Sequence, residues 1–159
     1  MTSNAFQQGR PEGRAKARSF GQRAALTVEA SPLMKGRDVV GSTVNLDVAP
    51  RLADQVDWTN KVTLQLSEDE LMAFASVLLG LLPSYHFKRP GKGIEVERQN
   101  GKIFVKATAG AGRIYVLPLS PGRVFATSML VLKQLQMHFD AADVQVVVAA
   151  LRGAAALLR

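Results

Sequence analysis

The sequence predicts an α+β protein of two antiparallel four-stranded β-sheet units, each followed by a helix, with a further helix at the C-terminus. Three observations lead to this prediction. Runs of alternating apolar and polar residues occur in two sets, each set precedes a helical pattern, and an apolar helical pattern ends the chain. With 159 residues, the chain has the usual size of one domain.

The composition is that of a globular protein, with 47% hydrophobic and 21% charged residues. Cysteine is absent, which excludes disulfides, thiolate metal sites and a cysteine nucleophile. The longest nearly uncharged run, residues 144–151, is far shorter than the roughly 20 residues that cross a bilayer. We therefore expect no transmembrane helix and no membrane partner.

Residues 1–20 are predicted to be a disordered basic arm, because they are rich in Gly, Gln, Arg and Ser and have few large apolar side chains. The first 23 residues contain five basic residues against one acidic residue, Glu12. This balance indicates a polyanionic partner, either nucleic acid or an anionic membrane surface. A solubilising tail and an organelle transit peptide are the alternatives for this arm.

The first unit begins after the arm. Residues 24–29, 44–48 and 62–66 alternate as strands with one buried face, and residues 34–40 form a weaker strand candidate. Ser67 and Glu70 form a capping box that starts a helix, which Gly80 and Pro83 end at about residue 81.

The second unit begins with a basic loop at residues 88–92. Strands follow at residues 93–98, 102–108 and 112–118, with an Asn-Gly hairpin turn between the first two. Ser120 as the cap and Pro121 at the first position start a helix that ends near residue 139, and its apolar residues predict cover on several sides. Residues 143–158 form an apolar helix that needs a partner, such as another protomer.

In order and spacing, these residues resemble the Whirly family of single-stranded DNA-binding proteins over about residues 21–139. Residues 23–29 (Arg-Ala-Ala-Leu-Thr-Val-Glu) are similar to the end of the family's Lys-Gly-Lys-Ala-Ala-Leu signature and the strand that it begins. Asp57-Trp58 and Leu66-Ser67 match the family's spacing up to its first helix, and residues 115–119 resemble its last strand. The domains are then an arm (1–20), a Whirly-like domain (21–140) and a C-terminal helix (141–159).

This resemblance implies a homotetramer that binds single-stranded DNA across its sheets with little sequence preference, in genome maintenance or transcription regulation. RNA is the alternative partner, since relatives with this architecture bind guide RNA. The implied location is the cytoplasm or nucleoid of a bacterium, or alternatively a mitochondrion or plastid.

The residues themselves indicate a binding surface on the second unit. If Ile103, Val105 and Ala107 face the core, Lys102, Phe104 and Lys106 face outward. With Ile114 and Val116 inward, Arg113 and Tyr115 join them to form a platform for stacking and phosphate contacts. The candidate nucleic-acid-binding residues are Arg23, Lys61, Thr63, Gln65, Lys88, Arg89, Lys92, Lys102, Phe104, Lys106, Arg113 and Tyr115.

Several aromatic residues have two interpretations at this level. Tyr85 and Phe87 either pack in the core or stack on bases beside His86 in the basic loop. Trp58 is either a buried anchor or a stacking residue. Phe104 and Tyr115 have the same alternative of a core or interface role.

We expect neither an enzyme nor a cofactor. The two histidines, His86 and His138, lie far apart in the sequence and match no metal-ligand spacing, and no nucleophile motif, P-loop or dinucleotide fingerprint is present. No catalytic or metal-binding residues are therefore predicted. A protein-interaction scaffold that docks through its terminal helix is the alternative from another functional class.

Overall fold

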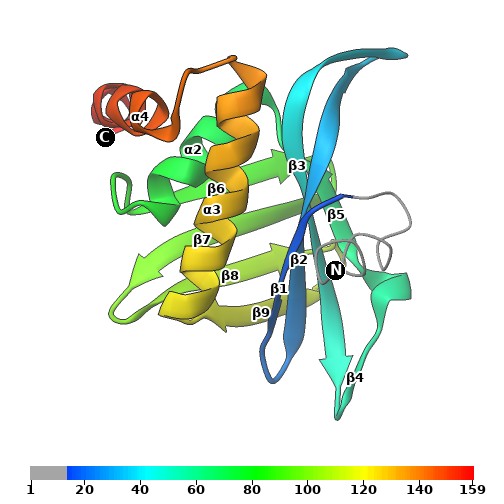
Figure 1. Cartoon of the computed structure of the whole chain (residues 1–159). Coiled ribbons are helices and arrows are strands. Elements are labelled where there is room, and N and C mark those ends of the chain that lie inside the picture. Colours follow the sequence, from blue (N-terminus) through cyan, green and yellow to red (C-terminus); the bar gives the residue numbers. More distant parts are fainter. Residues whose placement is uncertain (1–13) are drawn as a thin grey trace, which may run out of the picture.

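The first unit is a five-stranded antiparallel sheet followed by a helix. The structure is a computed structural model that describes residues 14–159. The first sheet contains β1 (Lys16–Phe20), β2 (Ala24–Lys35), β3 (Asp38–Leu52), β4 (Gln55–Val56) and β5 (Val62–Gln65), and the 3-10 helix η1 (Trp58–Asn60) precedes β5. Helix α2 (Glu68–Leu78) follows. The long β2–β3 hairpin is the centre of this sheet, because β1 pairs with β2 and β5 pairs with β3 (Figure 1).

The second unit repeats this order with a four-stranded antiparallel sheet. Its strands are β6 (Ser84–Arg89), β7 (Lys92–Gln99), β8 (Lys102–Thr108) and β9 (Ile114–Leu119), which pair in that order. Helices α3 (Pro121–His138) and α4 (Val144–Leu158) complete the chain. The predicted fold class is confirmed, with the two-residue β4 as an additional strand.

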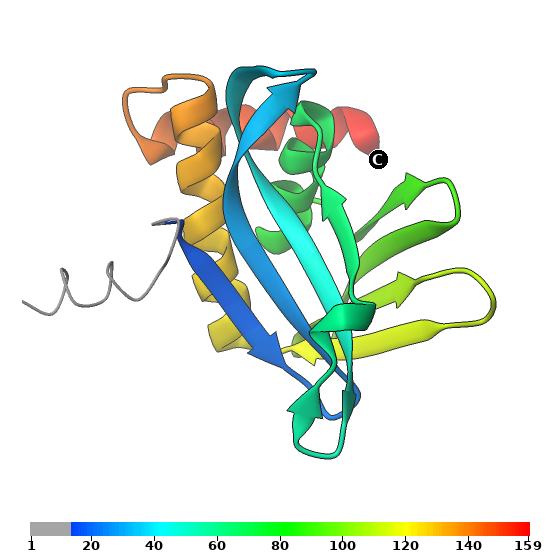
Figure 2. The same cartoon turned by 90° about the vertical axis from the view of Figure 1, so that its right-hand side faces the viewer.

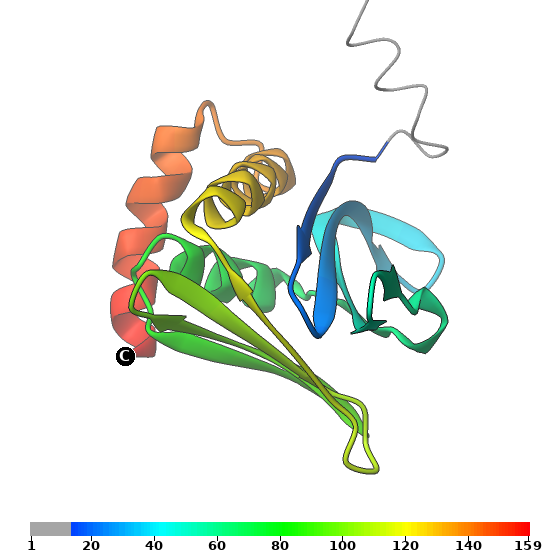
Figure 3. The same cartoon turned by 90° about the horizontal axis from the view of Figure 1, so that it is seen from below.

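The helices cover one face of the second sheet, and the first sheet stands beside them at an angle (Figure 3). Among the described residues, no helix or strand covers the opposite face of the second sheet. We call that opposite face the outer face of the second sheet. The corresponding outer face of the first sheet has η1 and β4 at one end (Figure 2).

One hydrophobic core joins both units. It contains Val28 and Leu46 of the first sheet and Ile94 of the second, all at most 1% exposed. Phe87 of β6 is fully buried and meets Phe74 of α2 edge to face, with ring centroids 5.8 Å apart. The core interpretation of Phe87 is thereby confirmed, and the half-buried Tyr85 packs against it with centroids 5.2 Å apart.

Two segments predicted as irregular are strands. Residues 16–20 of the predicted arm form β1, while residues 1–13 lie outside the described part of the chain. The inward side chains of β1 are the small Ala17 and Ser19, so the strand has no hydrophobic period to reveal it. The predicted basic loop contains the end of β6 and the start of β7, joined at Pro90-Gly91. The candidate strand at residues 34–40 comprises the end of β2, a turn at Gly36-Arg37 and the start of β3.

The helix boundaries follow the sequence closely. Ser67 and Glu70 form the predicted capping box, with both reciprocal hydrogen bonds present. Helix α2 ends at Leu78, before the left-handed Gly80. At α3 the Ser120 hydroxyl makes no capping hydrogen bond, contrary to its predicted role as a side-chain cap, whereas Pro121 begins the helix as predicted.

Helix α3 is less covered in the single chain than its composition predicts. Val131 and Leu135 are buried, but Phe125 is 66% exposed and Met137 is 55% exposed. The expected cover on several sides is therefore absent within residues 14–159.

Candidate nucleic-acid interface

The outer face of the second sheet has the side chains predicted for β8. Ile103 and Val105 are buried in the core. Because successive side chains of a strand point to opposite faces, Lys102, Phe104 and Lys106 project outward. Lys102 is exposed, and the other two are half-buried on that face. The predicted orientation of β8 is confirmed.

The predicted orientation of β9 is wrong. Tyr115 is only 8% exposed and faces the core with Leu117, whereas Ile114 is 54% exposed and Val116 faces outward. Both sets of alternating side chains are apolar, so periodicity alone does not determine which set is buried. Tyr115 is the register partner of Ala107, whose small side chain leaves room for the ring. Tyr115 therefore does not belong to the platform.

Acidic side chains limit this platform on the β7 side. Glu95 is the register partner of Lys106, and Glu97 is the register partner of Phe104. Both glutamates lie on the outer face, between β8 and the exposed Lys88 of β6. A polyanion that follows β8 is therefore repelled from the β6 side and favoured toward β9.

On the β9 side, the two sheets enclose a groove of about 490 Å³. This groove brings together two of the predicted residues, Arg23 and Phe104. Its lining comes from the β1–β2 turn, β3, β8 and β9 and consists of Phe20, Gly21, Gln22, Arg23, Arg51, Phe104, Val116, Leu117 and Pro118. Phe20 is 57% exposed. We call this feature the inter-sheet groove.

The β1–β2 turn is held against the second sheet. A Cβ atom on Gly21 would lie 2.7 Å from Cβ of Leu117, so a residue without a side chain lets the turn approach β9 this closely. Arg51 donates hydrogen bonds from Nη1 to the carbonyl oxygen of Gly21 (3.0 Å) and from Nε to that of Ala53 (3.2 Å). These contacts fix one arginine in the wall of the groove, beside the exposed Arg23.

Arg89 and Lys92 bind other parts of the protein. Arg89 donates to both carboxylate oxygens of Glu70 (2.8 and 2.9 Å) and to the carbonyl oxygen of Gln65 (2.7 Å). Nζ of Lys92 donates to the carbonyl oxygen of Thr63 at 2.7 Å. The β6–β7 hairpin thus holds β5 of the first sheet, and Arg89 and Lys92 make structural contacts there.

The ion pair between Glu70 and Arg89 changes the ionisation of both groups. Burial raises the pKa of Glu70, but the hydrogen bonds from Arg89 and Ser67 outweigh burial, so its pKa lies below the ordinary value. The hydrogen bond with Glu70 raises the pKa of Arg89. Both groups are therefore charged in the folded protein at neutral pH.

The remaining predicted residues lie on separate surfaces. Lys61 forms an ion pair with Asp47 (3.3 Å) on the outer face of the first sheet, where Thr63 and Gln65 are half-buried. Arg113 is exposed in the β8–β9 connection and donates to a backbone carbonyl there. The structure therefore brings together Arg23, Lys102, Phe104 and Lys106, but not the complete predicted set.

Sequence reasoning missed Phe20 and Arg51 in the groove. Phe20 belongs to β1, whose lack of an apolar period placed it in the predicted arm. The sequence does carry one indication of this strand. Large side chains (Lys16, Arg18 and Phe20) alternate with small ones (Ala17 and Ser19), as expected for a strand with one exposed face. Arg51 had no local signal, because its position depends on contacts with a turn about 30 residues earlier.

The fold of this chain also occurs in solved structures of other proteins. A structure described as "Crystal structures of trypanosoma bruciei MRP1/MRP2" superposes with a TM-score of 0.60 at 12% identity, covering 84% of this chain and 92% of that chain. A second, "Structure of a guideRNA-binding protein complex bound to a gRNA", gives a TM-score of 0.49 at 10% identity, covering 72% and 92%. No protein-family model and no curated protein matches the chain. At 12% identity the likeness to the first structure shows the fold alone, and membership of the Whirly family stays a prediction.

Within residues 14–159, no group of three or more acidic or histidine side chains is arranged to hold a metal ion. None of the helices described is both long enough and apolar enough to cross a membrane.

Proposed function

We propose that this chain binds single-stranded nucleic acid in the inter-sheet groove and along the adjoining outer side of β8, without chemical change to the strand. The observation that supports this function most directly is the composition of the groove. Phenylalanines from two different sheets, Phe20 and Phe104, line it together with Arg23 and Arg51.

This combination fits unpaired nucleotides. An unpaired base presents both faces for stacking, and base–aromatic stacking contributes roughly 1–3 kcal/mol per base. Arginine side chains bind phosphate oxygens and stack on bases. A double helix hides its base faces, so the two phenylalanines favour a single strand.

The charge of the chain favours the same partner. The formal net charge is +7. Lys102 and Lys106 flank Phe104 on the outward side of β8 and supply positive charges for phosphate contacts.

The groove can accept DNA and RNA strands alike. Stacking and phosphate contacts do not involve the 2′-hydroxyl group, which is the feature that separates RNA from DNA at a binding site. Competition between DNA and RNA oligonucleotides of matched sequence identifies the preferred strand.

Fluorescence anisotropy with labelled oligonucleotides tests this function. We expect the full chain to bind a single strand more tightly than the matched duplex, with affinity that falls as salt rises. For single strands, the slope of log affinity against log salt is about −0.7 per neutralised phosphate. Phe104→Ala should weaken binding about tenfold, which corresponds to the lower half of the stacking range.

Matched variants control for unspecific effects. Val39→Ala removes an exposed apolar side chain from the tip of the β2–β3 hairpin, away from the groove, and should leave affinity unchanged. Arg23→Ala should reduce the salt slope, whereas Arg37→Ala, in the exposed β2–β3 turn, should not. Equal effects of each variant and its control, or equal affinity for single strand and duplex, would contradict the proposed function.

Self-association belongs to the same proposal. The exposed apolar side chains Phe125, Met129 and Met137 share α3, and Leu157 of α4 is 87% exposed. Exposed apolar surface of this kind marks protein contacts. We propose that these helices bind other copies of the chain, as in the tetramer implied by the sequence resemblance, and leave the outer faces of the sheets open.

A further inference from the structure

A row of polar residues crosses the outer face of the first sheet beside the only tryptophan of the chain. Arg18, Thr27, Asp47 and Thr63 are successive register partners on β1, β2, β3 and β5. The guanidinium carbon of Arg18 lies 5.5 Å from the ring centroid of Trp58, within the range of a cation–π contact.

Two polar atoms in this row are buried without a partner. Oγ1 of Thr27 and Oδ1 of Asp47 have no hydrogen bond within the described residues, and Thr27 is only 4% exposed. The other carboxylate oxygen of Asp47 binds Lys61. Buried polar groups are nearly always hydrogen-bonded, so these two unpaired oxygens on adjacent strands are acceptors available to a ligand.

This row is continuous with the inter-sheet groove. Arg18 and Phe20 are two residues apart on β1, so both side chains lie on the outer side of that strand. Phe20 lines the groove, and Arg18 contacts Trp58. A strand that leaves the groove over Phe20 therefore reaches Trp58 next.

We propose that Arg18, Trp58, Thr27 and Asp47 form a second base-binding site, the Trp58 site, for the nucleotide that follows the one in the groove. This inference rests on the proposed function. In the free protein, the guanidinium group of Arg18 lies over the ring of Trp58. On binding, Arg18 turns to a phosphate, a base stacks on Trp58, and N–H groups of the base donate to Asp47 and Thr27.

Tryptophan fluorescence, excited selectively over the two tyrosines, reports on this site alone, because Trp58 is the single tryptophan. Unlabelled single-stranded oligonucleotide, titrated into the full chain, should quench this emission and protect it from acrylamide. The midpoint should coincide with that of the anisotropy titration. Binding by anisotropy without any change at Trp58 overturns the Trp58 site and leaves the proposed function intact, whereas no binding in either measurement overturns both.

Thr27→Val separates a ligand role from a structural one. Replacing the unpaired hydroxyl with a methyl group should leave the fold at least as stable, because a buried donor without a partner is removed. If the base uses Thr27, single-strand affinity falls several-fold in this variant. Unchanged affinity together with unchanged quenching contradicts the contact to the base.

Trp58→Ala and Trp58→Phe complete the test. The alanine variant should bind about tenfold more weakly, and the phenylalanine variant should recover most of the affinity, because any aromatic face can stack on a base. Leu52→Ala, an exposed apolar residue near η1, is the control and should bind normally. Wild-type affinity in Trp58→Ala overturns the Trp58 site.

Discussion

Phe104 and Tyr115 differ in whether the side chain lies on the exposed or the buried face of its strand, and this difference separates a surface role from a core role. The sequence places both rings on one platform, but in the structure Phe104 lies on the outer face and Tyr115 points into the core beside Ala107. The sequence shows which face of β8 is exposed, because the outward residues include two lysines. The sequence does not show which face of β9 is exposed, because both of its faces are apolar.

Alanine substitutions should therefore affect different properties at these two positions. Tyr115→Ala removes a buried ring and should lower the free energy of unfolding by about 3–5 kcal/mol, the usual loss for large aromatic side chains. Phe104→Ala should change the stability much less and reduce binding instead. Denaturant unfolding followed by circular dichroism measures both variants, and equal losses of stability would contradict the assigned orientations.

The sequence predicts which segments form strands better than it predicts which individual residues line the binding groove. Arg23 and Phe104 could be found from the sequence because local patterns mark them. Phe20 and Arg51 join them only through the contact of the β1–β2 turn with β9, which depends on long-range packing around Gly21.

Among the secondary-structure elements, the sequence indicates the helices more clearly than the strands. The capping box of α2 and Pro121 of α3 are local signals, and both helices begin at the predicted residues. Strand β1 pairs along its whole length with β2 but buries only small side chains, so its existence follows from backbone pairing rather than from composition.

The contact between β5, α2 and the β6–β7 hairpin predicts a dependence of stability on pH. The folded protein holds the pKa of Glu70 below its ordinary value of 4.5, through Arg89 and Ser67. A lowered pKa in the folded state means that this stabilisation is complete above the ordinary value and is lost as pH falls through the lowered value.

Glu70→Gln should remove that part of the pH dependence. Unfolding by urea at a series of pH values from about 7 to about 3 should give a shallower decline for the variant than for the wild type. Glu97→Gln, an exposed glutamate on β7, is the control. A decline of the same steepness in wild type and Glu70→Gln would exclude this contribution.

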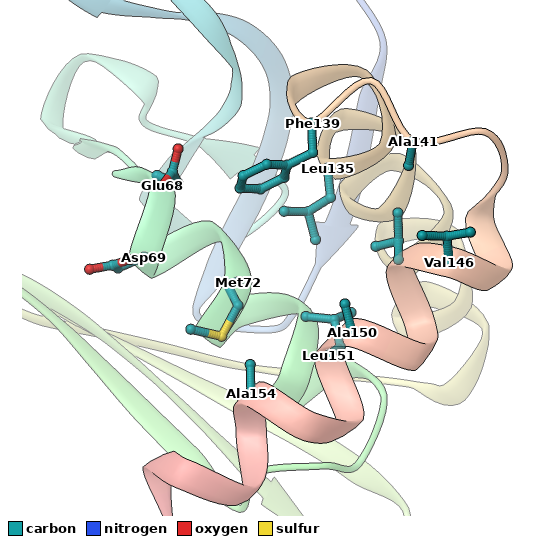
Figure 4. Close-up of a pocket in the computed structure, with 11 residues that line it drawn as sticks. Glu68, Asp69, Met72, Leu135, Phe139, Ala141, Val146, Ala150, Leu151 and Ala154 are labelled. Carbon is teal, nitrogen blue, oxygen red and sulfur yellow. The ribbon is translucent and has the colours of Figure 1, made fainter.

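At the scale of the whole molecule, the two surfaces have different chemistry. The helical side exposes Phe125, Met129 and Leu157, while aromatic and basic side chains meet in the inter-sheet groove. An apolar pocket of about 280 Å³ also lies between α2, α3 and α4 (Figure 4). This division is consistent with association through helices and ligand binding on sheets.

Light scattering tests the association. We expect a mass of about four protomers rather than the 17.2 kDa of one chain. Phe125→Glu places a charge in the exposed apolar surface of α3 and should shift the mass toward one protomer, whereas Arg37→Ala should not. A single-chain mass for the wild type at all concentrations would contradict association through the helices.

Photocrosslinking locates the bound strand on the protein surface. A single strand containing 5-bromouracil would be irradiated with the full chain, digested with trypsin and analysed by mass spectrometry. Cleavage after Arg and Lys places Phe20 in the peptide of residues 19–23, Phe104 in residues 103–106 and Phe125 in residues 124–133. We predict crosslinks to the first two peptides. Crosslinks confined to residues 124–133 or to other helical peptides would contradict binding in the inter-sheet groove.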